Sequence, residues 1–427
     1  MERLKHHAHT ALRRSEKYFK TDMVYLAKGG FWVTAQFALS SLAGLLLFAL
    51  LAHLLDAATF GIYRYVISLV GILGAFSLTA MTSAVTQAVS RGHERTLYSS
   101  IPLQLRWSLL SVLVGIIVSI YYLFNAHLIL SAAVLIGIIG ATIGAVFNTF
   151  IALYSGRKNF RALFLTTALI TIVQYSALAS AAFFTHNIII LIATFFISGM
   201  VMNIVLYFAV TRLSPPRGES DHPSLEFGKK MSFLNIIGLI SNNIDSVIVF
   251  HYLGAADLAI YAIAMIIPEK LRGVSKLAMP LMLPKLTEKE DEASAHAAIK
   301  PKLRFAVALF GTVALFYILI APILFKVIFP GYLNAVWYSQ IFALSIFAGI
   351  TIAPLTVFIA QKSLKNITSY SIIVPVIQTL IMLLGTIVFG LLGAVIARTL
   401  GLLFGSVYSF YLSRVTGRAL PLASSSE

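Results

Sequence analysis

Seven charged side chains lie inside stretches that are otherwise apolar enough to cross a lipid bilayer. They are two acids and five bases: Asp245, Glu269, Arg64, Lys270, Arg272, Lys276 and Arg398. The stretches 231–253 and 257–283, which hold most of them, each exceed the roughly 20 residues that span a hydrocarbon core. A charge at such a depth costs about 2.5–3.5 kcal/mol on insertion scales. We therefore expect these side chains to face a wet interior rather than lipid.

The charges in stretch 257–283 follow helical spacing. Glu269, Arg272 and Lys276 are spaced i, i+3 and i+7 and so share one face of a helix, with Lys270 about a quarter-turn away. The alternative to a solvated transport cavity is a salt bridge between helices combined with packing of small residues. Helix-breaking residues interrupt the same stretch and are expected hinges, because kinks concentrate at such positions. They are Pro268, Gly273 and Pro280.

The composition is that of a polytopic membrane protein. Of the 427 residues, 59% are hydrophobic and 11% are charged, and the mean hydropathy is +0.89. The net charge of +16 comes from basic residues spread between the apolar stretches, so nucleic-acid binding is not indicated. The chain has no cysteine, and its ten histidines show no paired ligand spacing within a helix. We expect neither a metal site nor a cofactor.

Apolar windows predict about twelve transmembrane helices and therefore an all-α fold. The expected spans are 31–55, 60–89, 103–124, 128–154, 162–184, 187–211, 230–252, 257–283, 303–325, 336–360, 367–390 and 393–413. Every second connection, and both tails, carry Lys and Arg, whereas the other connections are short and nearly uncharged. By the positive-inside rule, both termini are cytoplasmic.

The two halves of the chain repeat. HLLDAATFGIYRY at 53–65 aligns with HYLGAADLAIYAI at 251–263, an offset of 198 residues (251 − 53). Six helices per half is an even number, so the repeats share one orientation and relate by an axis along the membrane normal. We expect two pseudo-symmetric six-helix lobes around a central cavity.

The chain therefore divides into five parts. They are a basic amphipathic cytoplasmic N-terminus at 1–30, an N-terminal lobe at 31–211, a Pro-rich cytoplasmic linker at 212–229, a C-terminal lobe at 230–414 and a cytoplasmic tail at 415–427. The first part has apolar residues at helical spacing opposite basic ones, which favours a helix on an anionic membrane surface, with a disordered arm as the alternative. It has no continuous apolar core, so no cleavable signal peptide is expected.

Several segments together carry a family resemblance. They are DAATFGIY at 56–63, LGAADLAIY at 253–261, Asp245, PKL at 284–286 and the Gly/Ala-rich end at 390–414. With them the chain resembles, over nearly its whole length, the Wzx-type polysaccharide flippases of the multidrug/oligosaccharidyl-lipid/polysaccharide (MOP) exporter superfamily. The resemblance implies alternating access that moves undecaprenyl-pyrophosphate-linked oligosaccharide units to the outer leaflet of the bacterial cytoplasmic (inner) membrane. O-antigen, capsule or exopolysaccharide synthesis would follow, with a polysaccharide polymerase and a chain-length protein as expected partners.

The buried charges suit such a substrate. A pyrophosphate group fits a pocket in which cations outnumber anions, because Arg offers forked donors and Lys a point charge. The expected substrate-binding residues are Arg64, Lys270, Arg272, Lys276 and Arg398. Glu269 is expected to pair with Arg272 in the empty state. Tyr63, Tyr65 and Tyr261 are candidates for stacking on sugars, with helix packing as the alternative.

Asp245 is the expected site of coupling to H⁺ or Na⁺. No cation lies within four residues of it on the same helix, so it has no local charge partner. The alternative is a static bridge to Arg64 or Arg398, which lie at a similar depth.

Two other classes of protein remain open. A multidrug or cation antiporter of the same superfamily would usually need an acidic site, whereas the intramembrane charge here is mainly basic. A membrane-embedded glycan polymerase or ligase would be expected to carry a sizeable outer loop, whereas every outer loop here is short. Constellations of catalytic side chains are also missing. The sequence predicts a transporter and not an enzyme, and it does not predict the sugar, the coupling ion or the oligomeric state.

Overall fold

The computed structural model describes residues 23–279, 282, 286, 292–361 and 363–418, and these are helical with no strand among them. Most of the expected amphipathic N-terminus and most of the expected tail lie outside the described residues. Pro280, one of the expected hinges, also lies outside them.

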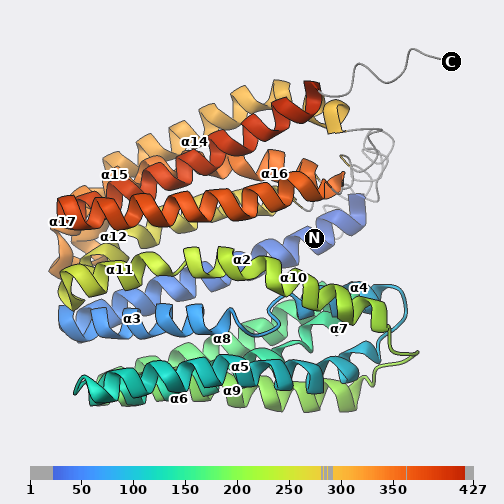
Figure 1. Ribbon diagram of the computed structural model, residues 1–427, viewed down its shortest axis with the longest axis horizontal. Helices are drawn as coiled ribbons and strands as arrows, with labels where there is room; N and C mark the ends of the chain where they lie inside the picture. Colours follow the sequence, from blue (N-terminus) through green and yellow to red (C-terminus); the bar gives the residue numbers. More distant parts are fainter. Residues whose placement is uncertain (1–22, 280–281, 283–285, 287–291, 362, 419–427) are drawn as a thin grey trace, which may run out of the picture.

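The first half of the chain forms eight helical elements. They are α2 (Met23–Leu54), α3 (Ala57–Gly74), α4 (Met81–Ser90), α5 (Thr96–Phe124), α6 (Leu128–Asn148), α7 (Ile151–Gly156), α8 (Phe160–Phe184) and α9 (Ile188–Leu213). Helix α6 packs on α5 and α9, and α8 packs on α9 and α2. These contacts build one bundle, the N-terminal lobe (Figure 1).

The second half repeats this plan. Its elements are α10 (His222–Ser241), α11 (Ile244–Leu253), α12 (Ala255–Gly273), η1 (Val274–Ala278), α14 (Glu292–Ile328), η2 (Pro330–Tyr332), α15 (Ala335–Phe342), η3 (Ala343–Thr351), α16 (Ile352–Ala360) and α17 (Leu364–Arg418). Helix α17 is two helices joined at Gly390, where φ is 60° and ψ is −140°. The second bundle, the C-terminal lobe, lies beside the first in Figure 1.

The prediction of twelve membrane helices is confirmed. Among the described residues, ten helical segments are long and apolar enough to cross a membrane. The longest, Leu364–Val415, contains the two helices that meet at Gly390. We count α12 as the twelfth membrane helix. It is not among the ten segments because its 19 residues carry four charges, Asp257, Glu269, Lys270 and Arg272.

Several spans predicted as single helices are interrupted. The expected span 60–89 breaks at residues 75–80, where the backbone makes i→i+3 hydrogen bonds and the Ser77 hydroxyl donates to the Gly74 carbonyl at 2.6 Å. The expected span 257–283 changes from α-helix to 3₁₀-helix after Gly273. The ends of α3 and α12 differ by 199 residues (273 − 74), within one residue of the repeat offset. The two halves therefore share the position of the break as well as the helix order.

The lobes meet where α3 crosses α12. A methyl group on Gly61 would lie 1.8 Å from the backbone oxygen of Ala255, so only glycine permits this approach. Ala57 precedes Gly61 by four residues and Ala255 precedes Ala259 by four, which is the small-xxx-small spacing of close helix pairs in membranes. In the alignment of the two halves, Ala57 corresponds to Ala255 and Gly61 corresponds to Ala259. The crossing therefore joins equivalent segments of the two repeats.

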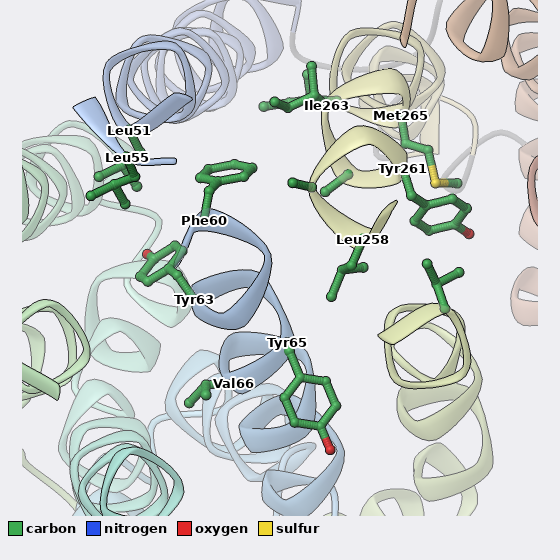
Figure 2. Packing of buried hydrophobic residues seen from close by; sticks show 14 of the residues in the cluster. Leu51, Leu55, Phe60, Tyr63, Tyr65, Val66, Leu258, Tyr261, Ile263 and Met265 are labelled. Atoms are coloured by element: carbon green, nitrogen blue, oxygen red, sulfur yellow. The ribbon is translucent and has the colours of Figure 1, made fainter. Parts of the chain in front are cut away.

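The apolar core lies beside this crossing. Figure 2 shows Leu51 of α2, Leu55 just after that helix and Phe60 of α3 near Leu258 and Ile263 of α12, and all five side chains are buried. The crossing lies near what we call the short-loop end, which contains residues 55–56, 125–127, 185–187, 254, 329–334 and 390. The opposite, basic end contains residues 91–95, 157–159, 214–221, 361 and 363. The lobes are thus sealed against each other at the short-loop end.

The linker is bound to the N-terminal lobe at the basic end. Glu94 accepts hydrogen bonds from Nε and Nη2 of Arg157 at 2.7 and 2.6 Å, and from the N–H of Arg217 at 2.8 Å. The Asp221 N–H donates to the Thr96 hydroxyl at 2.8 Å. Helix α10 begins at His222, so residues 222–229 of the expected linker are helical. This connection is a docked strap rather than a loose tether.

Replacing Glu94 with Gln is expected to release this strap. The Arg157 hydrogen bonds hold the pKa of Glu94 below its usual range. A depressed pKa stabilises the docked state above the ordinary carboxyl value of about 4.3, and this contribution is lost as the pH falls through the lowered pKa. Hydrogen bonds to charged groups contribute about 1.5–3 kcal/mol. At neutral pH the amides of residues 214–221 should exchange about tenfold faster or more in the variant.

Hydrogen exchange measured by mass spectrometry on protein in lipid nanodiscs can check this. Glu226→Gln is the matched control, because Glu226 pairs with Lys229 on the exposed face of α10 and should leave exchange in the linker unchanged. In the native protein the linker should stay protected down to about pH 4. Equal exchange in native and Glu94→Gln protein would mean that Glu94 does not hold the linker.

Candidate functional site

A cavity of about 190 Å³ lies between the lobes, on the basic side of the α3–α12 crossing. Helices α2, α3 and α8 of the N-terminal lobe form one wall, and α11 and α12 form the other together with the end of α10. Four of the charged residues expected from the sequence line it: Arg64, Asp245, Glu269 and Lys270. The structure thus brings together charges that are more than 200 residues apart in the chain.

One face of α12 supplies much of the lining. Tyr261, Ala262, Met265 and Ile266 line the cavity together with Glu269 and Lys270, which gives the spacing i, i+1, i+4, i+5, i+8 and i+9. This is the spacing of a single helical stripe. The rotation of α12 about its own axis therefore decides whether Glu269 and Lys270 face the cavity.

Two cations on opposite walls face this space. The guanidinium carbon of Arg64 lies 5.6 Å from the ring centroid of Phe48, a cation–π contact. Its Nε is buried and has no hydrogen-bond partner among the described residues. A methyl group on Gly44 would lie 3.8 Å from Nζ of Lys270 and 4.0 Å from the hydroxyl of Tyr175. The absence of a side chain at Gly44 leaves room beside Lys270.

Glu269 and Arg272 lie near each other, one turn apart on α12. Nη2 of Arg272 is 3.9 Å from Oε1 of Glu269, and the two side chains are 22% and 37% exposed. This is a loose ion pair in a partly open setting, so it stabilises the fold little. Nη1 of Arg272 is buried without a partner among the described residues. The Arg272 guanidinium keeps donors available for another group.

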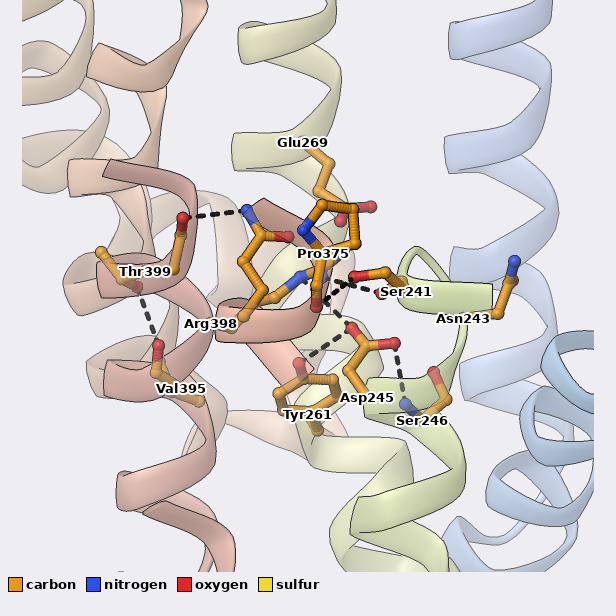
Figure 3. A network of polar contacts seen from close by, with 12 residues as sticks. Ser241, Asn243, Asp245, Ser246, Tyr261, Glu269, Pro375, Val395, Arg398 and Thr399 are labelled. Carbon is orange, nitrogen blue, oxygen red and sulfur yellow. Dashed lines mark hydrogen bonds and ion pairs between the residues drawn. The ribbon is translucent and has the colours of Figure 1, made fainter. Parts of the chain in front are cut away.

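Asp245 and Arg398 form a closer and drier pair (Figure 3). Nε of Arg398 lies 3.4 Å from Oδ2 of Asp245, and both side chains are less than a tenth exposed. The Tyr261 hydroxyl donates to the same carboxylate oxygen at 3.0 Å, and the Ser246 N–H donates to Oδ1 at 2.8 Å. The bridge to Arg398, the alternative to ion coupling from the sequence, is present in this structure. Arg398 is not among the residues that line the cavity.

The remaining expected residues lie elsewhere on the same helix or beyond it. Lys276 is exposed on η1, the 3₁₀ turn that follows Gly273, and is not among the residues that line the cavity. Pro268 is buried inside α12, and Gly273 is the last residue of that helix.

The aromatic candidates are mainly packing residues. Tyr63 and Tyr65 are buried, and the Tyr65 ring stacks on Phe250 with centroids 3.9 Å apart. Tyr261 reaches the cavity, but its hydroxyl is bound to Asp245. Sequence reasoning missed Tyr175, which lines the cavity from α8 without any local charge to mark it.

The cluster carries an excess of positive charge. The cavity lining itself is neutral, because Arg64 and Lys270 balance Asp245 and Glu269. Arg272, which pairs with Glu269, and Arg398, which pairs with Asp245, lie outside the lining, so the wider cluster has a formal charge of +2 (four cations less two acids). In the described part of the chain, no group of His, Asp or Glu side chains is arranged to hold a metal ion. A space of about 190 Å³ is smaller than the roughly 300–1,000 Å³ of pockets that enclose drug-sized ligands. The cavity in this structure is large enough for a small anionic group and too small for an oligosaccharide.

Comparison with known proteins gives one family match. The model of the family described as polysaccharide biosynthesis protein matches residues 26–282. A search of curated proteins found no match to the sequence.

Solved structures share the fold at low identity. The lipid II flippase MurJ in an inward closed conformation has a TM-score of 0.64 at 15% identity, covering 92% of this chain and 93% of that chain. An inward-facing multidrug resistance MATE family transporter of the MOP superfamily has a TM-score of 0.62 at 12% identity, covering 90% of this chain and 96% of that chain. A MOP superfamily transporter from Pyrococcus furiosus, described as having a binding pocket of reverse polarity, has a TM-score of 0.50 at 12% identity, covering 94% and 93%. These likenesses establish the architecture of the two lobes.

Proposed function

This chain belongs to the polysaccharide biosynthesis protein family, and from that premise we propose that it is a Wzx-type flippase that moves lipid-linked oligosaccharide units across the bacterial cytoplasmic membrane. The substrate is an oligosaccharide joined through pyrophosphate to a polyprenyl lipid such as undecaprenol. The fold likeness to a lipid II flippase supports this class of cargo.

The observation that carries the proposal is the uncompensated positive charge between the lobes. Arg64 and Lys270 line the cavity from opposite walls, and Arg272, one turn from Glu269 and outside the lining, keeps an unpartnered donor. Forked Arg donors and a Lys ammonium bind phosphate oxygens strongly in a partly dry site. A cation antiporter, the second candidate and one that the MATE likeness also allows, would need the opposite sign of charge.

The membrane orientation follows from the basic loops. Lys and Arg gather at the basic end, which we place in the cytoplasm with both termini. The lobes are sealed at the short-loop end. This form is therefore closed to the outside, and its cavity of about 190 Å³ must widen on the cytoplasmic side before it can receive the oligosaccharide.

The membrane potential contributes part of the driving force. Moving one charge through 100 mV releases about 2.3 kcal/mol, so a pyrophosphate with about two charges gains roughly 4–5 kcal/mol on outward transfer. The empty protein must then return its own cations. A carboxylate that takes H⁺ or Na⁺ would assist this step, and Glu269 is the more open of the two acids, since Asp245 is already paired.

Flipping by the purified chain in lipid vesicles tests the function. A fluorescent polyprenyl-pyrophosphate oligosaccharide in both leaflets should become fully accessible to a quencher added outside, at a rate that rises with an imposed potential. Deletion of the gene should cause the same lipid to accumulate in the cytoplasmic leaflet. Absence of flipping under every potential and ion gradient, together with increased drug sensitivity of the deletion strain, would favour the antiporter instead.

A further inference from the structure

The membrane helix that follows the linker is broken in its middle. Helix α10 ends at Ser241 and α11 begins at Ile244, so the last carbonyls of α10 and the first N–H groups of α11 lack helical partners. Nη1 of Arg398 donates to the Ser241 carbonyl at 3.3 Å, and the Asp245 carboxylate accepts from the Ser246 N–H at 2.8 Å. A cation thus meets the negative end of one helix dipole and an anion meets the positive end of the next.

Asp245 and Arg398 also connect three helices. Asp245 belongs to α11, Arg398 to the second half of α17, and Tyr261 to α12. The contacts that join them are the 3.4 Å ion pair and the 3.0 Å hydrogen bond from the tyrosine hydroxyl. Figure 3 shows these side chains converging beside the break, next to Ser241 and Pro375. The Ser241 hydroxyl also donates to the Pro375 carbonyl, at 3.4 Å.

We propose that Asp245, Arg398 and Tyr261 form a clamp that sets the rotation of α12, and that they are positioning residues rather than ligands of substrate or coupling ion. Tyr261 lies on the same stripe of α12 as Glu269 and Lys270, about two turns before them. Holding Tyr261 against Asp245 therefore turns Glu269 and Lys270 towards the cavity. This inference rests on the proposed function only for its transport readout.

The chemistry of the clamp disfavours the other two roles. Oδ2 of Asp245 already faces the Tyr261 hydroxyl and the Arg398 guanidinium, and Oδ1 holds the Ser246 N–H. A proton on Asp245 would leave the buried Arg398 cation without its counter-charge, and Na⁺ would have to displace that cation. The pair is neutral, so it adds nothing to the positive field that attracts phosphate. Nη1 of Arg398 and the Asp245 carboxylate instead bind partners at the helix break, while Nε of Arg398 meets the carboxylate as an ion pair without hydrogen-bond geometry.

A double-mutant cycle on flipping tests the clamp. Removing one partner of a buried pair leaves an uncompensated charge, whereas removing both does not. Asp245→Asn and Arg398→Gln should each lower the flipping rate by about tenfold or more, and the double variant should recover to within about threefold of the native rate. Tyr261→Phe, which keeps the ring and loses the hydroxyl, should give a smaller loss.

A second measurement reports the rotation directly and does not depend on flipping. The chain has no cysteine, so single reporters have no background. Met265 is 4% exposed and lines the cavity, whereas Ile263 is fully buried and does not line it. In Asp245→Asn protein, thiol labelling of Met265→Cys should fall and that of Ile263→Cys should rise, and both should return to the native pattern in the double variant.

The outcomes separate the possible roles. Unchanged labelling with reduced flipping would overturn the clamp and assign the pair to substrate or ion. Loss of ion-gradient dependence in Asp245→Asn that persists in the double variant would overturn it in favour of ion coupling. If the native chain flips no lipid, the proposed function fails, yet the labelling cycle still confirms or refutes the clamp.

Discussion

Replacing Gly61 with alanine is expected to open the short-loop end and to slow flipping severely. The new methyl group would lie 1.8 Å from the Ala255 carbonyl oxygen and 2.6 Å from its carbon. Both contacts are to backbone, so no side chain can rotate away. Overpacking of this kind costs about 1–3 kcal/mol, which shifts a two-state equilibrium by about 5- to 150-fold. The clash exists only while the lobes are closed, so the open state should gain population.

Thiol labelling from outside provides the measurement. A membrane-impermeant reagent should reach Ala262→Cys, a cavity residue, faster in the Gly61→Ala background than in the native background. Gly74→Ala is the matched control on the same helix, because a methyl group there meets no described atom within 4 Å. Native labelling and native flipping in Gly61→Ala would mean that this crossing does not close the outer side. Measuring the amount of folded protein in the membrane distinguishes gating from misfolding.

Neutralising the cavity cations should abolish transport without unfolding the protein. Lys270→Gln and Arg64→Gln each remove a charge that faces the space between the lobes. A charge-assisted hydrogen bond contributes about 1.5–3 kcal/mol, so each change should lower flipping by about 10- to 150-fold, given tenfold per 1.4 kcal/mol. The double variant should be inactive. Arg64→Lys should retain part of the activity, because it keeps the charge and loses the fork.

Lys276 is the control for this series. It is exposed on η1 outside the cavity lining, so Lys276→Gln should flip lipid at close to the native rate. The concentration of substrate lipid for half-maximal rate should rise in the cavity variants, because binding is weakened. A loss in Lys276→Gln equal to that in Lys270→Gln would show that general basic charge, and not the cavity, attracts the lipid.

The number of helices could be predicted from the apolar composition, and several residues of the site could be predicted from the free-energy cost of placing charges in lipid. Asp245, Glu269, Lys270 and Arg64 are expensive in lipid, so the expectation that they face a common interior needed no knowledge of the fold. They do line one cavity. Tyr175 carries no such cost in an apolar helix, so nothing local marks it.

Pairing and local helix geometry were harder to predict. The Asp245–Arg398 contact joins residues 153 positions apart (398 − 245), and charge at a similar depth allowed Arg64 as an equal partner. The 3₁₀ turn at Val274–Ala278, which contains Lys276, was not indicated by the α-helical spacing of the charges. The helix break at residues 75–80 lies in an apolar stretch of sequence. Hydropathy predicts the span but not the backbone hydrogen-bond pattern within it.

The docked linker has a mechanical consequence for the movement of the lobes. Its hydrogen bonds to Glu94 and Thr96 hold the start of α10 on the N-terminal lobe, while Arg398 of the C-terminal lobe holds the Ser241 carbonyl at its end. Helix α10 is therefore a strut of 20 residues, about 30 Å long, fixed to a different lobe at each end. A tilt of about 10° about Ser241 moves its far end by about 5 Å over that length. Any change in the angle between the lobes must therefore tilt α10, because the linker contributes almost no slack of its own.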